Sequence, residues 1–171
     1  TSIAIFHLSQ KNRAYYPDPK SDIAIALGEV VSRGVELEAS GEILPGWNVF
    51  AGYTFNTSSY EHDPSKEGDT YSPYTAKHIL RAYTTFELPG PAYRWTVGAG
   101  AQVQSRTKNT INKYPYTLEQ GGFVVYDASV HYKITDKIKA SFIVNNIFDR
   151  RYFLNVNNRA LSMNSYYGDP R

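Results

Sequence analysis

The sequence has no cysteine, and this absence excludes two kinds of structure. A disulfide framework is impossible, and so is a zinc site built from thiolates. There is also no run of about 18 or more apolar residues, so no transmembrane helix is expected. The formal net charge is only +2 over 171 residues, which gives no strong field for nucleic acid. We therefore expect no nucleic-acid partner.

Aromatic residues are plentiful, with 15 Tyr, 8 Phe and 2 Trp against a single Met. These residues favour pleated strands, and Tyr and Trp also favour the boundary between hydrocarbon and water. The mean hydropathy of -0.45 is compatible with a membrane barrel, because its strands alternate apolar and polar residues and average out.

Apolar and polar residues alternate with a period of two along most of the chain, as in β-strands. In the clearest example Trp95 and Val97 share one face while Arg94 and Thr96 share the other. Several segments have about 10 residues or more, which suits a tilted strand that crosses a membrane. The alternation predicts seven strands: Ser2 to Ser9 with an ambiguous phase, Gly34 to Ile43, Trp47 to Asn56, Ile79 to Leu88, Tyr93 to Gln104, Phe123 to Lys133 and Lys137 to Asn145.

The connections between these strands alternate in length. Leu44 to Gly46, Pro89 to Pro91 and Thr135 to Asp136 have the residues of tight turns. The long polar segments are Lys11 to Leu27, Ser58 to Ala76, Arg106 to Gly121 and Arg150 onward. Outer-membrane barrels have short periplasmic turns and long extracellular loops. The sequence therefore predicts an all-β fold, a segment of an antiparallel transmembrane β-barrel.

Aromatic residues gather near both ends of the apolar face. Trp47, Phe86, Tyr93 and Tyr132 lie near the tight turns, and Tyr53, Phe55 and Phe148 lie toward the long loops. Two such belts bracket a hydrocarbon band. The residues predicted to point into lipid are Leu37, Tyr53, Trp95, Val97, Tyr126 and Phe142. A β-sandwich with two packed apolar faces is the alternative, and the alternation of loop lengths favours the barrel.

Five segments together resemble the late barrel of TonB-dependent siderophore receptors, above all those for ferric pyoverdine, ferrioxamine and coprogen. The resemblance covers the chain from about Val31 to its end. Its motifs are weak singly and specific in this order: Arg33 to Glu38, Leu44 to Trp47, Ala51 to Phe55, Asn145 to Tyr152 and Tyr166 to Arg171.

This resemblance implies a barrel of about 22 strands with a plugged lumen, of which residues 1–171 are a C-terminal portion. It implies import of a ferric siderophore across the bacterial outer membrane, energised through TonB. The plug domain, the TonB-contacting segment and the last strand are expected outside this sequence. Outer-membrane lipid and lipopolysaccharide are the other implied partners. No cofactor is expected, because the iron travels within the siderophore.

Polar residues on the opposite face are expected to line the lumen. Carboxylates there could serve acid–base catalysis or bind Ca²⁺, but a polar wall that meets a plug or water is favoured. The lumen-facing candidates are Glu36, Glu38, Arg81, Arg94, Asp127 and His131.

Tyrosines in or beside the long loops are the candidates for contact with the siderophore. Such a ligand is rigid and partly apolar, so its receptor needs aromatic walls and a few polar groups. These tyrosines could instead order the loops or lie at the headgroup level. The candidates are Tyr71, Tyr74, Tyr114, Tyr116, Tyr152 and Tyr166.

Catalysis and metal binding find no support in the sequence. The four histidines, at positions 7, 62, 78 and 131, are scattered and show no zinc-site spacing. No nucleophile-elbow sequence occurs. We expect no enzyme. The alternatives that stay open are a receptor of the same fold for vitamin B12, haem or a glycan, and a small closed barrel or soluble β-sandwich acting as a binding or adhesin module.

Overall fold

The computed structural model describes residues 1–171 except 18–21, 65, 111–116 and 160–161. Within the described residues, no helix has the length and apolarity that crossing a membrane requires. Eleven strands and a 3₁₀ turn η1 (Gly90–Ala92) follow one another there. The strands are β1 (Ser2–Tyr15), β2 (Ile25–Leu44), β3 (Trp47–Glu61), β4 (His78–Glu87), β5 (Trp95–Gln104), β6 (Thr107–Thr110), β7 (Thr117–Gln120), β8 (Phe123–Lys133), β9 (Lys139–Val144), β10 (Phe153–Arg159) and β11 (Ser162–Tyr167).

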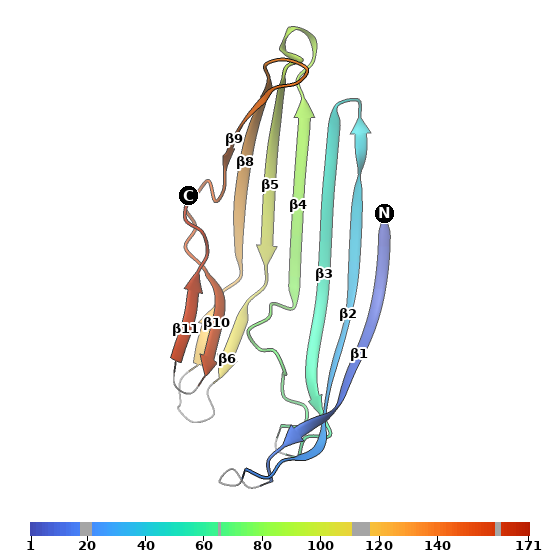
Figure 1. Cartoon of the computed structure of the whole chain (residues 1–171), viewed down its shortest axis with the longest axis vertical. Coiled ribbons are helices and arrows are strands. Elements are labelled where there is room, and N and C mark those ends of the chain that lie inside the picture. The colour runs from blue at the N-terminus through green and yellow to red at the C-terminus, as the bar shows by residue number, and fades with distance from the viewer. Residues whose placement is uncertain (18–21, 65, 111–116, 160–161) are drawn as a thin grey trace.

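Seven of these strands form one antiparallel sheet in the order β1-β2-β3-β4-β5-β8-β9. Figure 1 shows them as a long row, with the tight turns at one end and the long connections at the other. The sheet is open, so β1 and β9 are its edges. The predicted all-β class and the seven main strands are confirmed.

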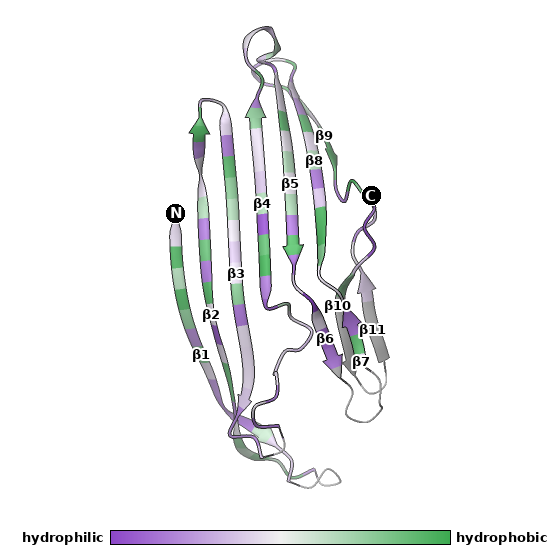
Figure 2. Cartoon of the chain, turned by 180° about the vertical axis from the view of Figure 1, so that it is seen from behind, coloured by the Kyte–Doolittle hydropathy of each residue, from purple (hydrophilic) through white to green (hydrophobic). Residues whose placement is uncertain are grey.

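Cross-strand pairing places the residues that are predicted to face lipid on one side of the sheet. Leu37 pairs with Tyr53, and Tyr53 pairs with Leu80. Val97 pairs with Val130, and Val130 pairs with Phe142. One continuous apolar surface, the outer face, therefore crosses the sheet, and Figure 2 shows the alternation along the strands.

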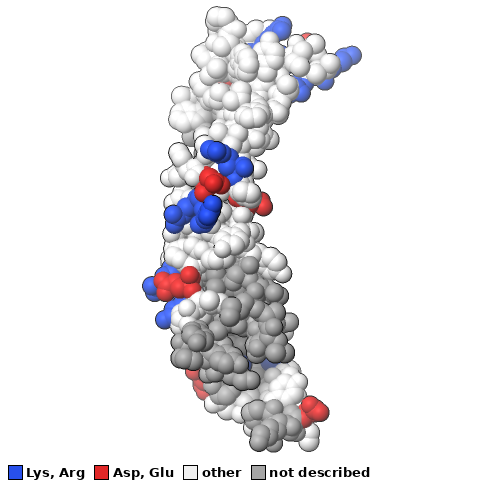
Figure 3. Space-filling model, turned by 90° about the vertical axis from the view of Figure 1, so that its left-hand side faces the viewer, with Lys and Arg blue, Asp and Glu red and all other residues white. Residues whose placement is uncertain are grey.

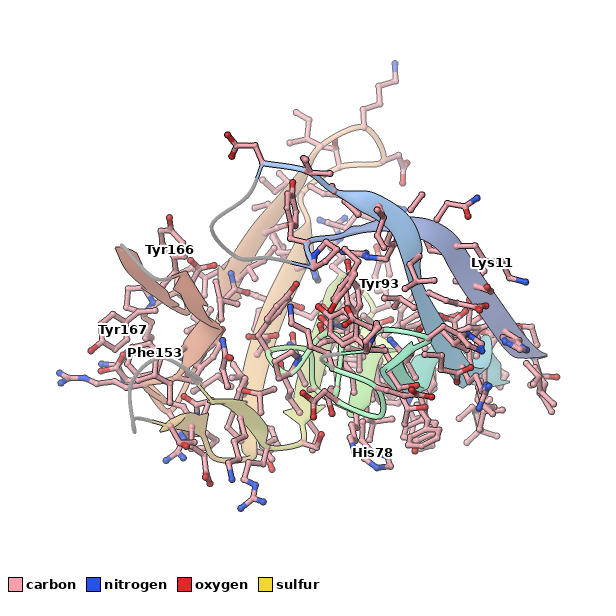
Figure 4. All side chains as sticks on the ribbon, turned by 90° about the horizontal axis from the view of Figure 1, so that it is seen from below. Lys11, His78, Tyr93, Phe153, Tyr166 and Tyr167 are labelled. Carbon is pink, nitrogen blue, oxygen red and sulfur yellow. The ribbon has the colours of Figure 1, made fainter. Side chains whose placement is uncertain are left out.

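The strand β1, whose phase the sequence leaves ambiguous, takes its phase from its partner. Ile3 pairs with Leu37 and Ile5 with Val35, so both lie on the outer face. The opposite side, the inner face, lines the hollow of the curved sheet. Figure 4 looks along the strands from the long-loop end and shows His78 pointing away from that hollow.

The predicted loops Lys11 to Leu27 and Ser58 to Ala76 are shorter than expected, because β1, β2 and β3 extend into them. β1 continues to Tyr15 and β2 begins at Ile25, so both ends of Lys11 to Leu27 are strand. A bulge interrupts β1 where Asn12 takes a φ of 58°, and the register shifts between Gln10 and Arg13. A bulge breaks the alternation that marks a strand, which explains why the sequence pattern ends early.

The predicted loops Arg106 to Gly121 and Arg150 onward each contain a hairpin. β6 pairs with β7, and β10 pairs with β11, in two separate small sheets. These strands have only four to seven residues, so alternation is too brief to reveal them. At the other end, Tyr93 lies after η1 in the α region, so β5 begins at Trp95 instead of the predicted Tyr93.

Candidate ligand-binding face

A hollow of about 370 Å³ opens on the sheet where the long connections meet β1, β2 and β3. Most of its lining side chains carry a hydroxyl or an amide and none carries a formal charge: Leu8, Ser9, Gln10, Val30, Ser32, Asn56, Ser58, Tyr71, Ser72 and Thr75. Ser32 donates a hydrogen bond of 2.7 Å to Asn56 Oδ1. The hollow can therefore offer both donors and acceptors to a polar ligand.

Tyr71 is the aromatic wall of this hollow. Its hydroxyl accepts a hydrogen bond of 2.8 Å from Arg13 Nη1, and the Arg13 guanidinium carbon lies 4.6 Å from the ring centre. Tyr60 meets the Tyr71 ring edge-on at 5.3 Å. A cation over the ring face fixes the ring orientation. Tyr71 is thus preorganised beside the hollow, as a binding residue requires.

The connection that carries Tyr71 is itself ordered by backbone hydrogen bonds. Ser59 and Thr70 form an isolated bridge, and Tyr60 N donates to the Asp69 carbonyl at 2.9 Å. Tyr71 N donates to the Ser58 carbonyl at 3.1 Å. Tyr74, in the same connection, is 39% exposed. Both predicted tyrosines of this loop therefore lie at the long-loop end of the sheet.

Tyr152 lies in a second cluster, at the junction between β9 and the β10–β11 hairpin. Its ring stacks on Phe123 with centres 4.4 Å apart. A methyl group at Gly168 would lie only 2.0 Å from Tyr152 Cζ, so only glycine fits against this ring. Burial raises the pKa of Tyr152. These contacts make Tyr152 a packing residue in this structure.

Of the remaining predicted tyrosines, Tyr166 lies within the described residues. Tyr166 is 61% exposed on β11. Figure 4 shows it on the opposite side of the arc from Lys11, near Phe153 and Tyr167. Those two rings stack with centres 4.6 Å apart. Tyr114 and Tyr116 lie outside the described residues.

Most of the predicted lumen residues share the inner face of the sheet. Glu36 pairs with Thr54 and Glu38 with Gly52. Arg81 also pairs with Gly52, from the other side. This register places Arg81 two strands away from the two carboxylates, with β3 between them.

Asp127 and His131 have specific partners on β8 and β9. The Asp127 carboxylate accepts a hydrogen bond of 2.9 Å from the backbone N–H of Asn146. The His131 Nδ1 and Nε2 atoms lie 2.8 Å from Ser141 Oγ and 3.0 Å from Ser129 Oγ. Both side chains are occupied by structural hydrogen bonds.

Arg94 is placed differently from the other predicted lumen residues. It precedes β5, and its Nε donates a hydrogen bond of 3.2 Å to the Tyr93 hydroxyl. Its Nη1 donates a hydrogen bond of 3.5 Å to the carbonyl of Ile134, two residues beyond Tyr132, whose ring packs on Trp95. Its guanidinium therefore sits at the tight-turn end of the sheet, among interface aromatics.

Sequence reasoning missed Arg13, which it assigned to a loop. The bulge at Asn12 hid the continuation of β1, and the contact with Tyr71 joins positions far apart in the chain. Among the described residues, no group of three His, Asp or Glu side chains is arranged to hold a metal ion. The hollow offers an aromatic wall and hydrogen-bonding groups.

Comparison with known proteins identifies the family. Residues 1–158 match the model of the TonB dependent receptor-like β-barrel. The chain is 33% identical over 183 residues to the ferripyoverdine receptor of Pseudomonas aeruginosa, covering 100% of this chain and 22% of that protein. It is 31% identical over 172 residues to the ferric-pyoverdine M114 receptor of Pseudomonas sp. (strain M114), covering 98% and 20%.

The fold agrees with these matches. The crystal structure of the ferripyoverdine receptor of the outer membrane of Pseudomonas aeruginosa bound to ferripyoverdine superposes with a TM-score of 0.81 at 30% identity, covering 98% of this chain and 23% of that one. The chain thus spans about a fifth of the length of the relatives it matches. It belongs to the TonB-dependent receptor β-barrel family.

Proposed function

We propose that this chain is the C-terminal barrel portion of a bacterial outer-membrane transporter that binds ferric siderophores and imports them with energy supplied through TonB. The observation that carries this proposal is the match to ferripyoverdine receptors over nearly the whole chain. The predicted plug and TonB-contacting segment belong to the rest of the protein. No bond chemistry is required of the residues described.

The hollow beside Tyr71 supports the proposal chemically. A ferric siderophore brings its iron fully coordinated, so its receptor needs no metal ligands and works by apolar walls and a few directed polar groups. Tyr71 supplies a wall, and Ser32, Asn56 and Ser72 supply polar groups. We propose Tyr71 and Tyr74 as ligand contacts, and Tyr166 as a contact from the opposite side of the arc.

The inner face supports a second part of the proposal. Glu36, Glu38 and Arg81 form a polar wall that suits a solvated lumen or a polar plug surface. Asp127 and His131 hold strands together through hydrogen bonds. We propose that these residues shape the lumen and do not contact the iron.

The test is uptake of radioactive iron by cells that lack their own siderophore receptors and carry the intact receptor. Ferripyoverdine, a hydroxamate and a catecholate complex should be offered separately, beside vitamin B12 and haem. We expect uptake of a ferric siderophore, and loss of uptake when TonB is deleted. Uptake of vitamin B12 or haem, with no uptake of any ferric siderophore, would contradict the proposal and favour a receptor of the same fold for that other ligand.

A matched pair of variants tests the site. Removing a preorganised aromatic contact commonly weakens binding by about tenfold, so Tyr71→Ala should raise the Kd for the imported complex by about that factor. His7→Ala, on the outer face of β1, should leave it unchanged because His7 pairs with Arg33, away from the hollow. Equal affinity in both variants would remove Tyr71 from the site.

A further inference from the structure

The apolar outer face ends in a row of aromatic side chains next to the tight turns. Trp47 pairs with Phe86, and the Trp47 indole donates a hydrogen bond of 2.7 Å to Thr84 Oγ1. Trp95 pairs with Tyr132, with ring centres 4.5 Å apart. Tryptophan and tyrosine in such a row mark the depth where hydrocarbon gives way to headgroups. The residues just beyond the row therefore lie at headgroup level.

Arg94 lies at this boundary and is held by tyrosines. Its Nε donates to the Tyr93 hydroxyl, its guanidinium carbon lies 5.7 Å from the Tyr93 ring centre, and its Nη1 donates to the Ile134 carbonyl at 3.5 Å. Hydrogen bonds to the two hydroxyls raise the pKa of Arg94, first that to Tyr93 and then that to Tyr132. Arginine offers five donors in a planar fork. The Tyr93 hydroxyl and the Ile134 carbonyl take two of them, so the fork still has donors for an outside acceptor.

The neighbouring turn adds more positive charge. Lys133, Lys137 and Lys139 surround the β8–β9 turn. The carboxylate in that turn, Asp136, lies 2.8 Å from Lys133 Nζ. The segments 90–95 and 133–139 together carry four cations against this single carboxylate. Figure 3 shows basic side chains at this end, and a second group with charges of both signs halfway down the molecule.

The opposite half of the same end has a different character. Glu42, at the end of β2, accepts a hydrogen bond of 2.6 Å from Gly46 N. Glu87 ends β4 and packs beside Gly46. The cations are therefore concentrated on the β5, β8 and β9 side, where the aromatic row includes Trp95 and Tyr132. Exposed Ile134 and Ile138 continue the apolar surface into that turn.

We propose that Arg94, with Tyr93, Tyr132 and Lys137 of the β8–β9 turn, binds the phosphate of an anionic glycerophospholipid in the leaflet that faces the tight turns. The chemistry fits in three respects. The acyl chains would lie on the apolar outer face, the glycerol region would meet the aromatic row, and the guanidinium would bond the phosphate oxygens as a fork. The surplus of positive charge favours a lipid with a net negative headgroup.

Native mass spectrometry of the intact receptor in neutral detergent tests this. Phosphatidylglycerol and phosphatidylcholine with identical acyl chains should be titrated in turn. We expect tighter retention of phosphatidylglycerol. R94Q should weaken that retention by about fivefold, the value of one basic residue at an anionic surface. R94K should weaken it less, because it keeps the charge.

R33Q is the matched control. It removes the same charge from the far end of the sheet, where Arg33 forms an ion pair with Glu61. It should bind phosphatidylglycerol like the unaltered receptor, and heat-modifiable gel migration should show that each variant is folded. Equal weakening in R94Q and R33Q would overturn the proposal. Displacement of the lipid by excess inorganic phosphate alone would also overturn the proposal, because the basic residues would then be a site for a free anion.

Discussion

The hydroxyl of Tyr83 lies 2.7 Å from the hydroxyl of Ser129, although β5 runs between their two strands. Gly98 and Gly100 of β5 leave room for the Tyr83 ring. A methyl group at Gly98 would lie 2.6 Å from the Tyr83 oxygen and 2.5 Å from Ser129 Oγ. The ring thus crosses a strand at positions without side chains and ties β4 to β8.

Gly98→Ala should therefore destabilise the barrel. The added methyl group forces Tyr83 away from Ser129, and overpacking of this kind costs about 1–3 kcal/mol. Thermal unfolding of the intact receptor in detergent measures the effect. Gly121→Ala is the control, because nothing lies within 4 Å of a methyl group there. Unchanged melting in Gly98→Ala would show that Tyr83 has room elsewhere.

Arginine at Val97 should destabilise the receptor in lipid. Val97 lies on the outer face between Phe86 and Val130, close to the aromatic row, so a cation there should cost less than the about 2–4 kcal/mol that it costs at the bilayer midplane. Reversible folding of the receptor into lipid vesicles, measured by denaturant titration, gives this change in the free energy of unfolding. Gln102→Arg, on the inner face of the same strand, should cost much less. A larger cost at Gln102 would reverse the assignment of the two faces.

Labelling on intact cells tests the orientation. The segment has no cysteine of its own, so single substitutions can report separately. Glu67→Cys, in the long connection between β3 and β4, should react with a membrane-impermeant maleimide. Asp136→Cys, in the β8–β9 turn, should react only after the outer membrane is opened. The opposite pattern would place the tight turns outside.

Asn146→Ala should detach the C-terminal segment. The Asn146 side chain is buried, donates to the carbonyls of Arg150 and Asp169, and accepts from Arg150 N. Each carbonyl left without a partner costs about 1–3 kcal/mol, and a φ of 51° at this position also disfavours alanine. Hydrogen exchange of residues 153–159 should rise. Asn145→Ala, an exposed neighbour, should leave exchange unchanged; equal increases would contradict this role.

Strong alkali should loosen the same junction through Tyr152. Burial raises the pKa of its hydroxyl above the ordinary value near 10, and the Asp169 and Asp127 carboxylates add to the shift. A raised folded pKa contributes stability that is complete below about pH 10 and is lost as pH rises through the folded pKa. Tyr152→Phe should flatten the alkaline fall in melting temperature, whereas Tyr166→Phe should not. Identical profiles in all three proteins would exclude Tyr152 as the cause.

The sequence predicts the main sheet well because its information is local. Alternation places Leu37, Val97 and Phe142 on one face, and pairing keeps them together across the strands. The phase of β1 is ambiguous from its own residues, because only pairing with β2 decides it. Register between strands is a long-range property that a single strand does not carry.

The candidate site is predicted only in part for the same reason. Tyr71 is found because aromatic residues in a polar loop stand out. Arg13 is missed because its contact with Tyr71 depends on a bulge and on the fold of the β3–β4 connection. The packing role of Tyr152 is hidden because it depends on Gly168, which follows a hairpin that alternation does not mark.

The alternation of short and long connections has a consequence for how the sheet assembles. Tight turns join β2 to β3 and β8 to β9. Each of these pairs can therefore form as an independent β-hairpin. Joining β5 to β8 must instead close the chain across residues 105–122. Closure entropy grows slowly with length, by about 0.6 kcal/mol for each doubling. Inserting an epitope into the long connections should therefore slow assembly little, whereas lengthening the Pro45–Gly46 turn would delay the earliest step.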